Sequence, residues 1–216
     1  MATASPPSDI FIASDPATPG YYAPSRTALL LLDFHKMFVE RAAGPDGPVA
    51  LVAAADLRSW AKSHGIQVIH CLIDVHGTPH PTCKGSARVG AIVAAMAQDG
   101  AEEPAELARD FGDNEITFTR RPGHVSALKS PGLEEHLQSQ GIKNLFLAGL
   151  STSGCVLRTA LAACDAEYVV TVVSDGCADG REGLHESALK AVEMMGHVAT
   201  AAEIQEGYAK VIERKI

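Results

Sequence analysis

The sequence predicts an α/β protein with a three-layer α/β/α architecture and a six-stranded, mostly parallel sheet. Short apolar runs of strand length alternate along the chain with segments of helical periodicity. The run at residues 27–33 is continuously apolar until its final Asp, which is typical of a strand covered on both faces in a parallel sheet. Ligands of such sheets bind beyond the carboxyl ends of the strands, at a topological switch point, so we expect the chemistry at that edge.

The elements are predicted in chain order. Residues 1–26 contain five prolines and should form an irregular arm on the surface or on a neighbouring subunit. Residues 27–216 should form a single domain, because no internal repeat or linker divides them. Strands are predicted at residues 27–33, 66–74, 115–120, 145–148, 168–175 and 197–200. Helices are predicted at residues 49–64, 87–97, 131–141, from 155 onward, 184–195 and 201–213.

Local patterns justify these segments. Residues 168–175 are the most β-branched run of the chain, which favours a strand. Residues 49–64 place apolar side chains largely along one helical face. Gly141 is a plausible stop signal for the helix that precedes it. Polar residues gather near the predicted strand ends, namely Asp33, Asp74, Arg121, Cys155 and Asp175.

Composition narrows the class of protein. A net charge of −8 without a basic cluster argues weakly against nucleic-acid binding. Five cysteines without paired spacing indicate a reduced protein, with the cytoplasm as the default location. No apolar run has the length of a transmembrane helix, so no membrane association is expected. No cofactor is expected.

One segment concentrates the reactive groups. Residues 145–148 are an apolar strand, residues 149–154 have the composition of a tight turn, and helical periodicity begins at Cys155. A sulfur at the start of a helix lies near unpaired N–H groups that favour a thiolate and an adjacent anion. The alternative is that Cys155 is a small buried hydrophobe, as most cysteines are.

A catalytic thiol also needs a base and an oxyanion partner. Asp33 is the candidate base, with a helix cap as its alternative role. Arg121 is the candidate cation, with a surface salt bridge as its alternative role. The backbone N–H groups of Ser151 and Cys155 are the candidate oxyanion hole.

Three segments resemble the isochorismatase-like cysteine hydrolases, which include isochorismatases, nicotinamidases and N-carbamoylsarcosine amidohydrolases. They are Thr-Ala-Leu-Leu-Leu-Leu-Asp33, Gly149-Leu-Ser-Thr152-Ser-Gly-Cys155-Val156 and Tyr168-Val-Val-Thr-Val-Val-Ser-Asp175-Gly-Cys-Ala-Asp. The resemblance covers roughly residues 25–205 and implies a Rossmann-like isochorismatase fold. It also implies Cys155 as nucleophile, Asp33 as base, and a cis peptide between Leu150 and Ser151 that directs the Ser151 and Cys155 amides at the oxyanion.

The chain departs from this family at the third catalytic position. The family has a Lys after the third strand, where this sequence reads Arg120-Arg121-Pro-Gly-His124-Val-Ser-Ala. Arg121 is the preferred replacement and Arg120 the alternative. Either keeps the charge, but an arginine stays protonated and cannot shuttle a proton.

A second departure concerns metal. Asp74 and His76, followed by His80, resemble part of the nicotinamidase metal site, but the family's downstream His has no obvious counterpart, so no metal is expected. The residues expected to bind substrate are His35, Phe38, His76, His124 and Thr152.

The favoured function is hydrolysis of a small molecule, at a non-peptide C–N amide bond, through a thioester on Cys155. The alternatives are isochorismate-type vinyl ether hydrolysis and an inactive binding protein on the same fold. Rapid alkylation of Cys155 near neutral pH would separate an enzyme from a binding protein. The resemblance further implies a homodimer or homotetramer.

Overall fold

The computed structural model describes residues 10–108 and 115–213, and its centre is a six-stranded sheet. The strands are β1 (Thr27–Leu32), β2 (Gln67–Ile73), β3 (Glu115–Arg120), β4 (Asn144–Leu150), β5 (Val169–Ala178) and β6 (His197–Ala199). The α-helices are α1 (Gly47–Ser63), α2 (Ser86–Gln98), α3 (Leu133–Ser139), α4 (Leu157–Asp165), α5 (Leu184–Val192) and α6 (Ala201–Glu213). The predicted α/β class and the six strands are confirmed.

The strands lie in the order β3-β2-β1-β4-β5-β6, and every pair is parallel. The sheet is therefore fully parallel, where the sequence predicted only that most of it would be. All six residues of β1 and all seven of β4 are buried, as expected for central strands with helices on both faces. The chain leaves β1 in one direction and β4 in the other, which places the topological switch point between them.

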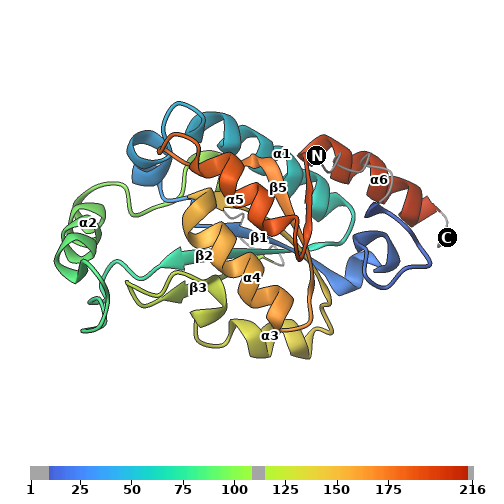
Figure 1. Ribbon diagram of the computed structural model, residues 1–216, viewed down its shortest axis with the longest axis horizontal. Coiled ribbons are helices and arrows are strands. Elements are labelled where there is room, and N and C mark those ends of the chain that lie inside the picture. Colours follow the sequence, from blue (N-terminus) through green and yellow to red (C-terminus); the bar gives the residue numbers. More distant parts are fainter. Residues whose placement is uncertain (1–9, 109–114, 214–216) are drawn as a thin grey trace.

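Helices cover both faces of the sheet (Figure 1). On one face, α1 and α6 pack against alternate residues of the central strands, including Leu29, Leu31 and Phe146. On the other face, α3, α4 and α5 pack against the intervening residues, including Leu30 and Leu145. This alternation is the two-residue period of a strand, and it yields the predicted three layers.

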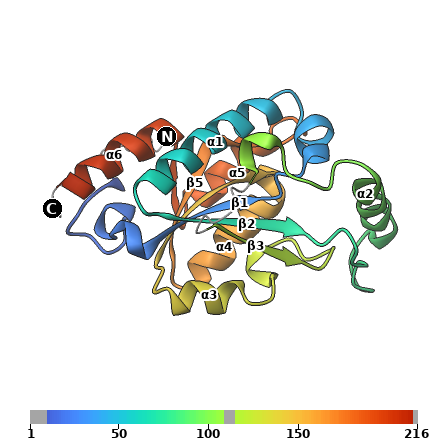
Figure 2. The same cartoon turned by 180° about the vertical axis from the view of Figure 1, so that it is seen from behind.

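Helix α2 stands apart from the layered body in both views (Figures 1 and 2). Only Val93 and Met96 of its residues are buried. Its apolar composition predicts a helix correctly but gives no indication that the helix lies outside the sandwich.

The described part of the arm before β1 contains two short 3₁₀ helices, Pro19–Tyr21 and Pro24–Arg26. Phe11 is buried against α6, where a Cβ added at Gly207 would lie 2.2 Å from its ring. The part of the predicted arm at residues 1–9 lies outside the described residues.

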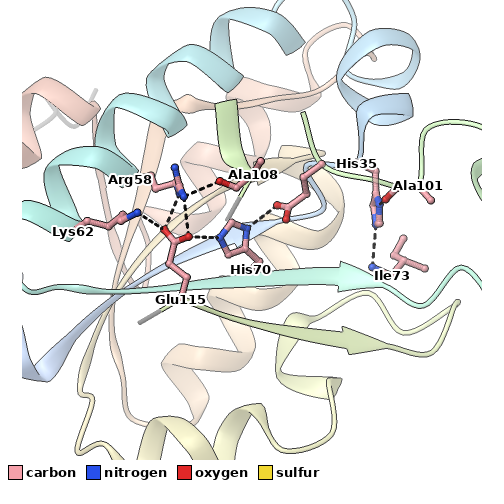
Figure 3. Close-up of polar contacts among 9 residues, drawn as sticks. His35, Arg58, Lys62, His70, Ile73, Ala101, Ala108 and Glu115 are labelled. Carbon is pink, nitrogen blue, oxygen red and sulfur yellow. Dashed lines mark hydrogen bonds and ion pairs between the residues drawn. The ribbon is translucent and has the colours of Figure 1, made fainter. Parts of the chain in front are cut away.

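A buried ionic cluster joins α1 to the sheet (Figure 3). Arg58 donates two hydrogen bonds of 2.8 Å to the Glu115 carboxylate. The His70 ring lies between two carboxylates, with Nδ1 2.8 Å from Glu103 and Nε2 3.7 Å from Glu115. Lys62 lies 3.6 Å from the same Glu115 carboxylate. The members of this cluster are far apart along the chain, so no local sequence pattern indicates it.

Strand β5 extends further than predicted. A register shift between Leu147 and Gly149 lets β5 resume pairing with β4 through Cys177 and Ala178. Asp175 therefore lies within β5 instead of at its end, and its carboxylate accepts the Ala201 N–H at the start of α6. The expected position of Asp175 at the ligand edge is wrong.

Of the helices in residues 10–108 and 115–213, none is long and apolar enough to cross a membrane.

Candidate active site

The switch point brings together the ends of two buried strands. Leu32 of β1 pairs with Gly149 of β4, so the residues that follow these strands emerge side by side. A Cβ added at Gly149 would lie 2.5 Å from Leu32, so the close approach requires glycine. Asp33 follows the first strand, and the turn that carries Cys155 follows the second.

Asp33 forms a buried bidentate ion pair with Arg120. The Arg120 Nη1 and Nη2 groups donate to the two Asp33 oxygens at 2.9 and 2.5 Å. Nε of the same guanidinium donates to the His124 carbonyl at 2.9 Å. The exposed fractions of Asp33 and Arg120 are only 3% and 2%. Burial alone would lower the pKa of Arg120, but the charge of Asp33 and its hydrogen bonds raise that pKa above the ordinary value.

This placement decides between the two arginines. Arg120 is the last residue of β3 and is buried, whereas Arg121 is exposed. The Arg121 guanidinium donates to the carbonyls of Thr78 and Pro79 at 2.8 and 3.3 Å. The preference for Arg121 at the third position is therefore not supported by the geometry, and the alternative, Arg120, lies against Asp33. The sequence cannot show which of two adjacent arginines points into the site, because the direction of each side chain depends on the residue at which β3 ends.

The turn after β4 holds Cys155 two residues before the start of α4. The peptide between Leu150 and Ser151 is cis, as the resemblance implies. The Ser151 carbonyl accepts the amides of Gly154 and Val156 at 3.1 and 3.3 Å. The Cys155 Sγ lies 3.1 Å from the Leu150 carbonyl. The sequence predicted that this region leads directly into an α-helix at Cys155, but α4 begins only after the separate turn Thr152–Val156.

The resting Cys155 is a neutral thiol. Burial raises its pKa well above the ordinary value, the Asp33 charge raises it further, and the Arg120 charge partly offsets these effects. The thiol donates to the Leu150 carbonyl, and the Asp33 and Arg120 charges act on its pKa in opposite directions. Asp33, Arg120 and Cys155 therefore form one coupled group of side chains.

The raised pKa revises the expectation of rapid alkylation. Only the thiolate reacts with iodoacetamide, and Cys155 is 4% exposed, whereas Cys83 is partly exposed. At pH 7.5 we expect Cys155 to be alkylated at least about tenfold more slowly than Cys83. Peptide mass spectrometry over a time course measures both rates. Denatured protein, in which all five cysteines should react at similar rates, is the control. Faster labelling of native Cys155 than of Cys83 would contradict this assignment of its protonation state.

His35 and Phe38 were both expected to bind substrate, but His35 instead bridges two backbone segments (Figure 3). The buried His35 ring joins two segments, with Nδ1 2.6 Å from the Ala101 carbonyl and Nε2 accepting the Ile73 N–H at 3.1 Å. These partners define a neutral ring with its proton on Nδ1, so neither nitrogen is left to bind substrate. Phe38 packs edge-on against His35, with ring centroids 5.5 Å apart.

The other predicted substrate residues differ in position. His76 is exposed, and its amide bonds to Asp74 Oδ1 at 2.9 Å. His124 adjoins the site through its carbonyl, which accepts from Arg120, and its ring contacts the His80 ring in a tilted arrangement with centroids 5.3 Å apart. Burial and the nearby positive groups lower the pKa of His124, so its ring is neutral at pH 7. Of the predicted histidines, His124 is therefore the one that the described contacts connect to Arg120.

The residues that resemble a metal site do not form a ligand set. Asp74 Oδ1 accepts the His76 amide, and the His80 ring lies 3.1 Å from the Thr82 hydroxyl and 3.3 Å from the Gly123 carbonyl. Across the described ranges, no group of three His, Cys, Asp or Glu side chains is placed to hold a metal ion. We derive no catalytic step through a metal.

Thr152, the fifth predicted substrate residue, is buried and engaged elsewhere. Its hydroxyl lies 2.8 Å from His185 Nδ1, on α5. The next residue, Ser153, bonds through its amide and hydroxyl to Asp179. Neither Asp179 nor His185 was predicted as a site residue. The one available signal was that Asp179 ends the third family-like segment.

A parallel α/β domain with a cysteine, a carboxylate and a guanidinium near its switch point has the general architecture of α/β enzymes, which bind their ligands at that edge of the sheet. The chain belongs to the isochorismatase domain family, whose model matches residues 27–203. A segment of 78 residues, 36% of the chain, is 32% identical to isochorismatase domain-containing protein 2 of Xenopus laevis and spans 38% of that relative.

Solved structures share the fold at low identity. A cysteine hydrolase from Pseudomonas syringae has a TM-score of 0.73 and 18% identity, over 88% of this chain and 95% of its own. An isochorismatase-like hydrolase from Alkaliphilus metalliredigens has a TM-score of 0.68 and 22% identity, over 87% and 99%. A ribonuclease from Caenorhabditis elegans has a TM-score of 0.66 and 18% identity, over 89% and 90%. A ribonuclease and two hydrolases thus share one fold, and the fold alone does not define the reaction.

Proposed function

We propose that this chain is a cysteine-dependent hydrolase of a small molecule, which cleaves a non-peptide C–N amide bond through a thioester on Cys155. The observation that carries the proposal is the coupled group of Asp33, Arg120 and Cys155, buried where β1 and β4 end. Burying two opposite charges costs desolvation energy, which a purely structural role does not require. The position of the Asp33–Arg120 pair near the Cys155 sulfur therefore favours a chemical role.

The first half of the reaction follows from the protonation states. Asp33 accepts the Cys155 proton as the sulfur attacks the substrate carbonyl carbon. The amides of Ser151 and Cys155 stabilise the oxyanion that forms. Asp33 then donates that proton to the departing amine nitrogen, the C–N bond breaks, and a thioester remains.

In the second half, Asp33 accepts a proton from water while the oxygen attacks the thioester carbon. The C–S bond breaks, the acid product leaves, and the Cys155 sulfur regains the proton. Each carboxylate oxygen of Asp33 has two lone pairs, so bidentate contact with Arg120 leaves acceptor capacity for the thiol.

Arg120 acts in this scheme as a fixed charge. It orients the Asp33 carboxylate through two bonds and lowers the pKa of Cys155 against the effect of burial. It transfers no proton, because a guanidinium stays protonated in proteins. The Arg in place of the family Lys therefore supports an electrostatic role for this position.

The test is to trap the acyl-enzyme. The protein is incubated with nicotinamide, N-carbamoylsarcosine or isochorismate, quenched in acid, and analysed by intact and peptide mass spectrometry. We expect an amide substrate to add its acyl group to the peptide containing Cys155. The Asp33→Asn variant, which retains the sulfur but lacks the base, should accumulate no adduct. Amide turnover without an adduct on Cys155 at any quench time, confirmed by unchanged turnover after Cys155 is replaced, would refute the thioester route.

A vinyl ether hydrolase is the second candidate, because the chain belongs to the family named for isochorismatase. In that reaction Asp33 would protonate the enol ether and Cys155 would matter less. A substrate with several carboxylates needs free cationic side chains, but Arg120 is already bonded to Asp33 and Arg121 to a loop carbonyl. This engagement favours the amide reaction. The net charge of −8 likewise argues against an RNA substrate.

A further inference from the structure

The segment after β5 holds the nucleophile turn from its outer side. Asp179 directly follows β5, and its Oδ2 accepts both the amide and the hydroxyl of Ser153, at 3.0 and 2.5 Å. Six residues later, His185 Nδ1 lies 2.8 Å from the Thr152 hydroxyl. Two consecutive residues of the turn are thus bonded to one segment, residues 179–185.

The Asp179 carboxylate is fully used by these contacts. Its other oxygen, Oδ1, accepts the amide and Nε of Arg181 at 3.2 and 3.3 Å, and the side chain is 1% exposed. The exposed Arg181 also donates to the Ser153 hydroxyl at 2.7 Å. Burial alone would raise the pKa of Asp179, but the bonds from Ser153 and Arg181 lower it below the ordinary value. The group is therefore an ionised acceptor at neutral pH.

The same segment also contacts the loop that follows Asp33. A Cβ added at Gly180 would lie 2.2 Å from the Ala42 carbonyl and 3.2 Å from the Gly44 nitrogen. Residues 179–180 thus lie between the loop after β1 and the turn after β4. One short segment contacts the chain on both sides of the proposed site.

The bond to Ser153 fixes the middle of the turn. Bonds described above use the amides of Ser153, Gly154 and Val156. None of these bonds uses the amides of Ser151 or Cys155, which are the proposed oxyanion donors. Since an oxyanion hole depends on donors held at fixed positions, a support outside the turn affects the reaction directly.

We propose that Asp179 is a positioning residue, whose carboxylate holds Ser153 so that the turn presents the Cys155 sulfur and the oxyanion amides in the geometry for attack. The inference rests on the proposed function. It assigns to Asp179 no contact with substrate.

The test compares two isosteric Asp→Asn variants, one directly after β5 and one within it. In Asp179→Asn, one oxygen becomes an NH₂ group that faces donors of either Ser153 or Arg181, so one pair of bonds is lost. We expect kcat for the amide identified in the trapping experiment to fall about 10- to 100-fold with KM nearly unchanged. Asp175→Asn is the matched control. It should leave kcat unchanged, because the Asp175 carboxylate bonds to Ala201 on α6.

Hydrogen–deuterium exchange supplies a readout that does not need turnover. In Asp179→Asn, amides of the peptide spanning residues 150–156 should exchange at least about tenfold faster than in the wild type. Exchange in the other peptides and the melting temperature of the protein should stay close to the wild-type values. If wild-type protein hydrolyses no amide, the proposed function fails, while faster exchange in this peptide still reports the support by Asp179.

A second variant covers the case in which Asp179→Asn does not fold. Ser153→Ala keeps the amide bond to Asp179 but removes the hydroxyl bond, so we expect a smaller loss of kcat, about 3- to 10-fold, in the same direction. Wild-type kcat and wild-type exchange in both variants would overturn the proposal. An equal loss in Asp175→Asn would also overturn it, since the effect would then be a general one of removing a negative charge in or next to β5.

Discussion

Replacing Arg120 with methionine is expected to lower the free energy of unfolding by about 3–5 kcal/mol, because it leaves the buried Asp33 carboxylate without its counter-ion. The guanidinium makes three described bonds, two to Asp33 and one to the His124 carbonyl, and methionine makes none of them. Urea denaturation followed by far-UV circular dichroism measures the loss. Turnover should fall in parallel, since Arg120 orients the proposed base.

The adjacent arginine provides the matched control. Arg121→Met removes an exposed side chain bonded to two loop carbonyls, and it should change stability by less than about 1 kcal/mol. Similar losses in the two variants would contradict the assignment of Arg120 to the buried pair. In the double variant Asp33→Asn with Arg120→Met, the loss should be smaller than the sum of the single losses, because no unpaired charge is left.

Replacing Cys155 with alanine should reduce amide turnover by at least about 10³-fold, because the proposed reaction forms its covalent intermediate on this sulfur. The substitution removes one buried atom and should cost no more than about 1–2 kcal/mol of stability. Steady-state assays of product release measure the rate, and thermal unfolding confirms the fold. Cys177→Ala, which removes an equally buried sulfur from the neighbouring strand β5, is the control and should retain turnover.

The same variant separates the two candidate reactions. If the chain cleaves a vinyl ether, Cys155→Ala should retain much of that activity, whereas Asp33→Asn should lose it. An amide hydrolase should lose activity in both variants. Retention of amide turnover in Cys155→Ala would exclude the sulfur as nucleophile.

Sequence patterns were sufficient for the architecture. Continuous apolar runs such as residues 27–32 predict strands covered on both faces, and strands alternating with helical segments predict a parallel sheet. The cysteine after a strand and small-residue turn, with an aspartate after an earlier strand, also indicated two members of the site. These patterns involve residues that are close together in the sequence, so they can be recognised without knowledge of the tertiary contacts.

The choice between Arg120 and Arg121 was not local. It depends on the residue at which β3 ends and on which face of the sheet that residue points toward, and pairing with β2 fixes both. The same reason explains His35, which resembles a pocket residue in sequence but is occupied by partners at residues 73 and 101.

By itself, then, the sequence determined the layered α/β fold, the order of its elements, and the placement of Asp33 and Cys155 at strand ends, because short-range hydrophobic periodicity and turn composition carry that information. The tertiary structure decided which arginine neutralises Asp33, that the resting thiol is protonated, and that Asp179 holds the turn. Those outcomes depend on burial and on contacts between residues 26 to 87 positions apart, which no local pattern records.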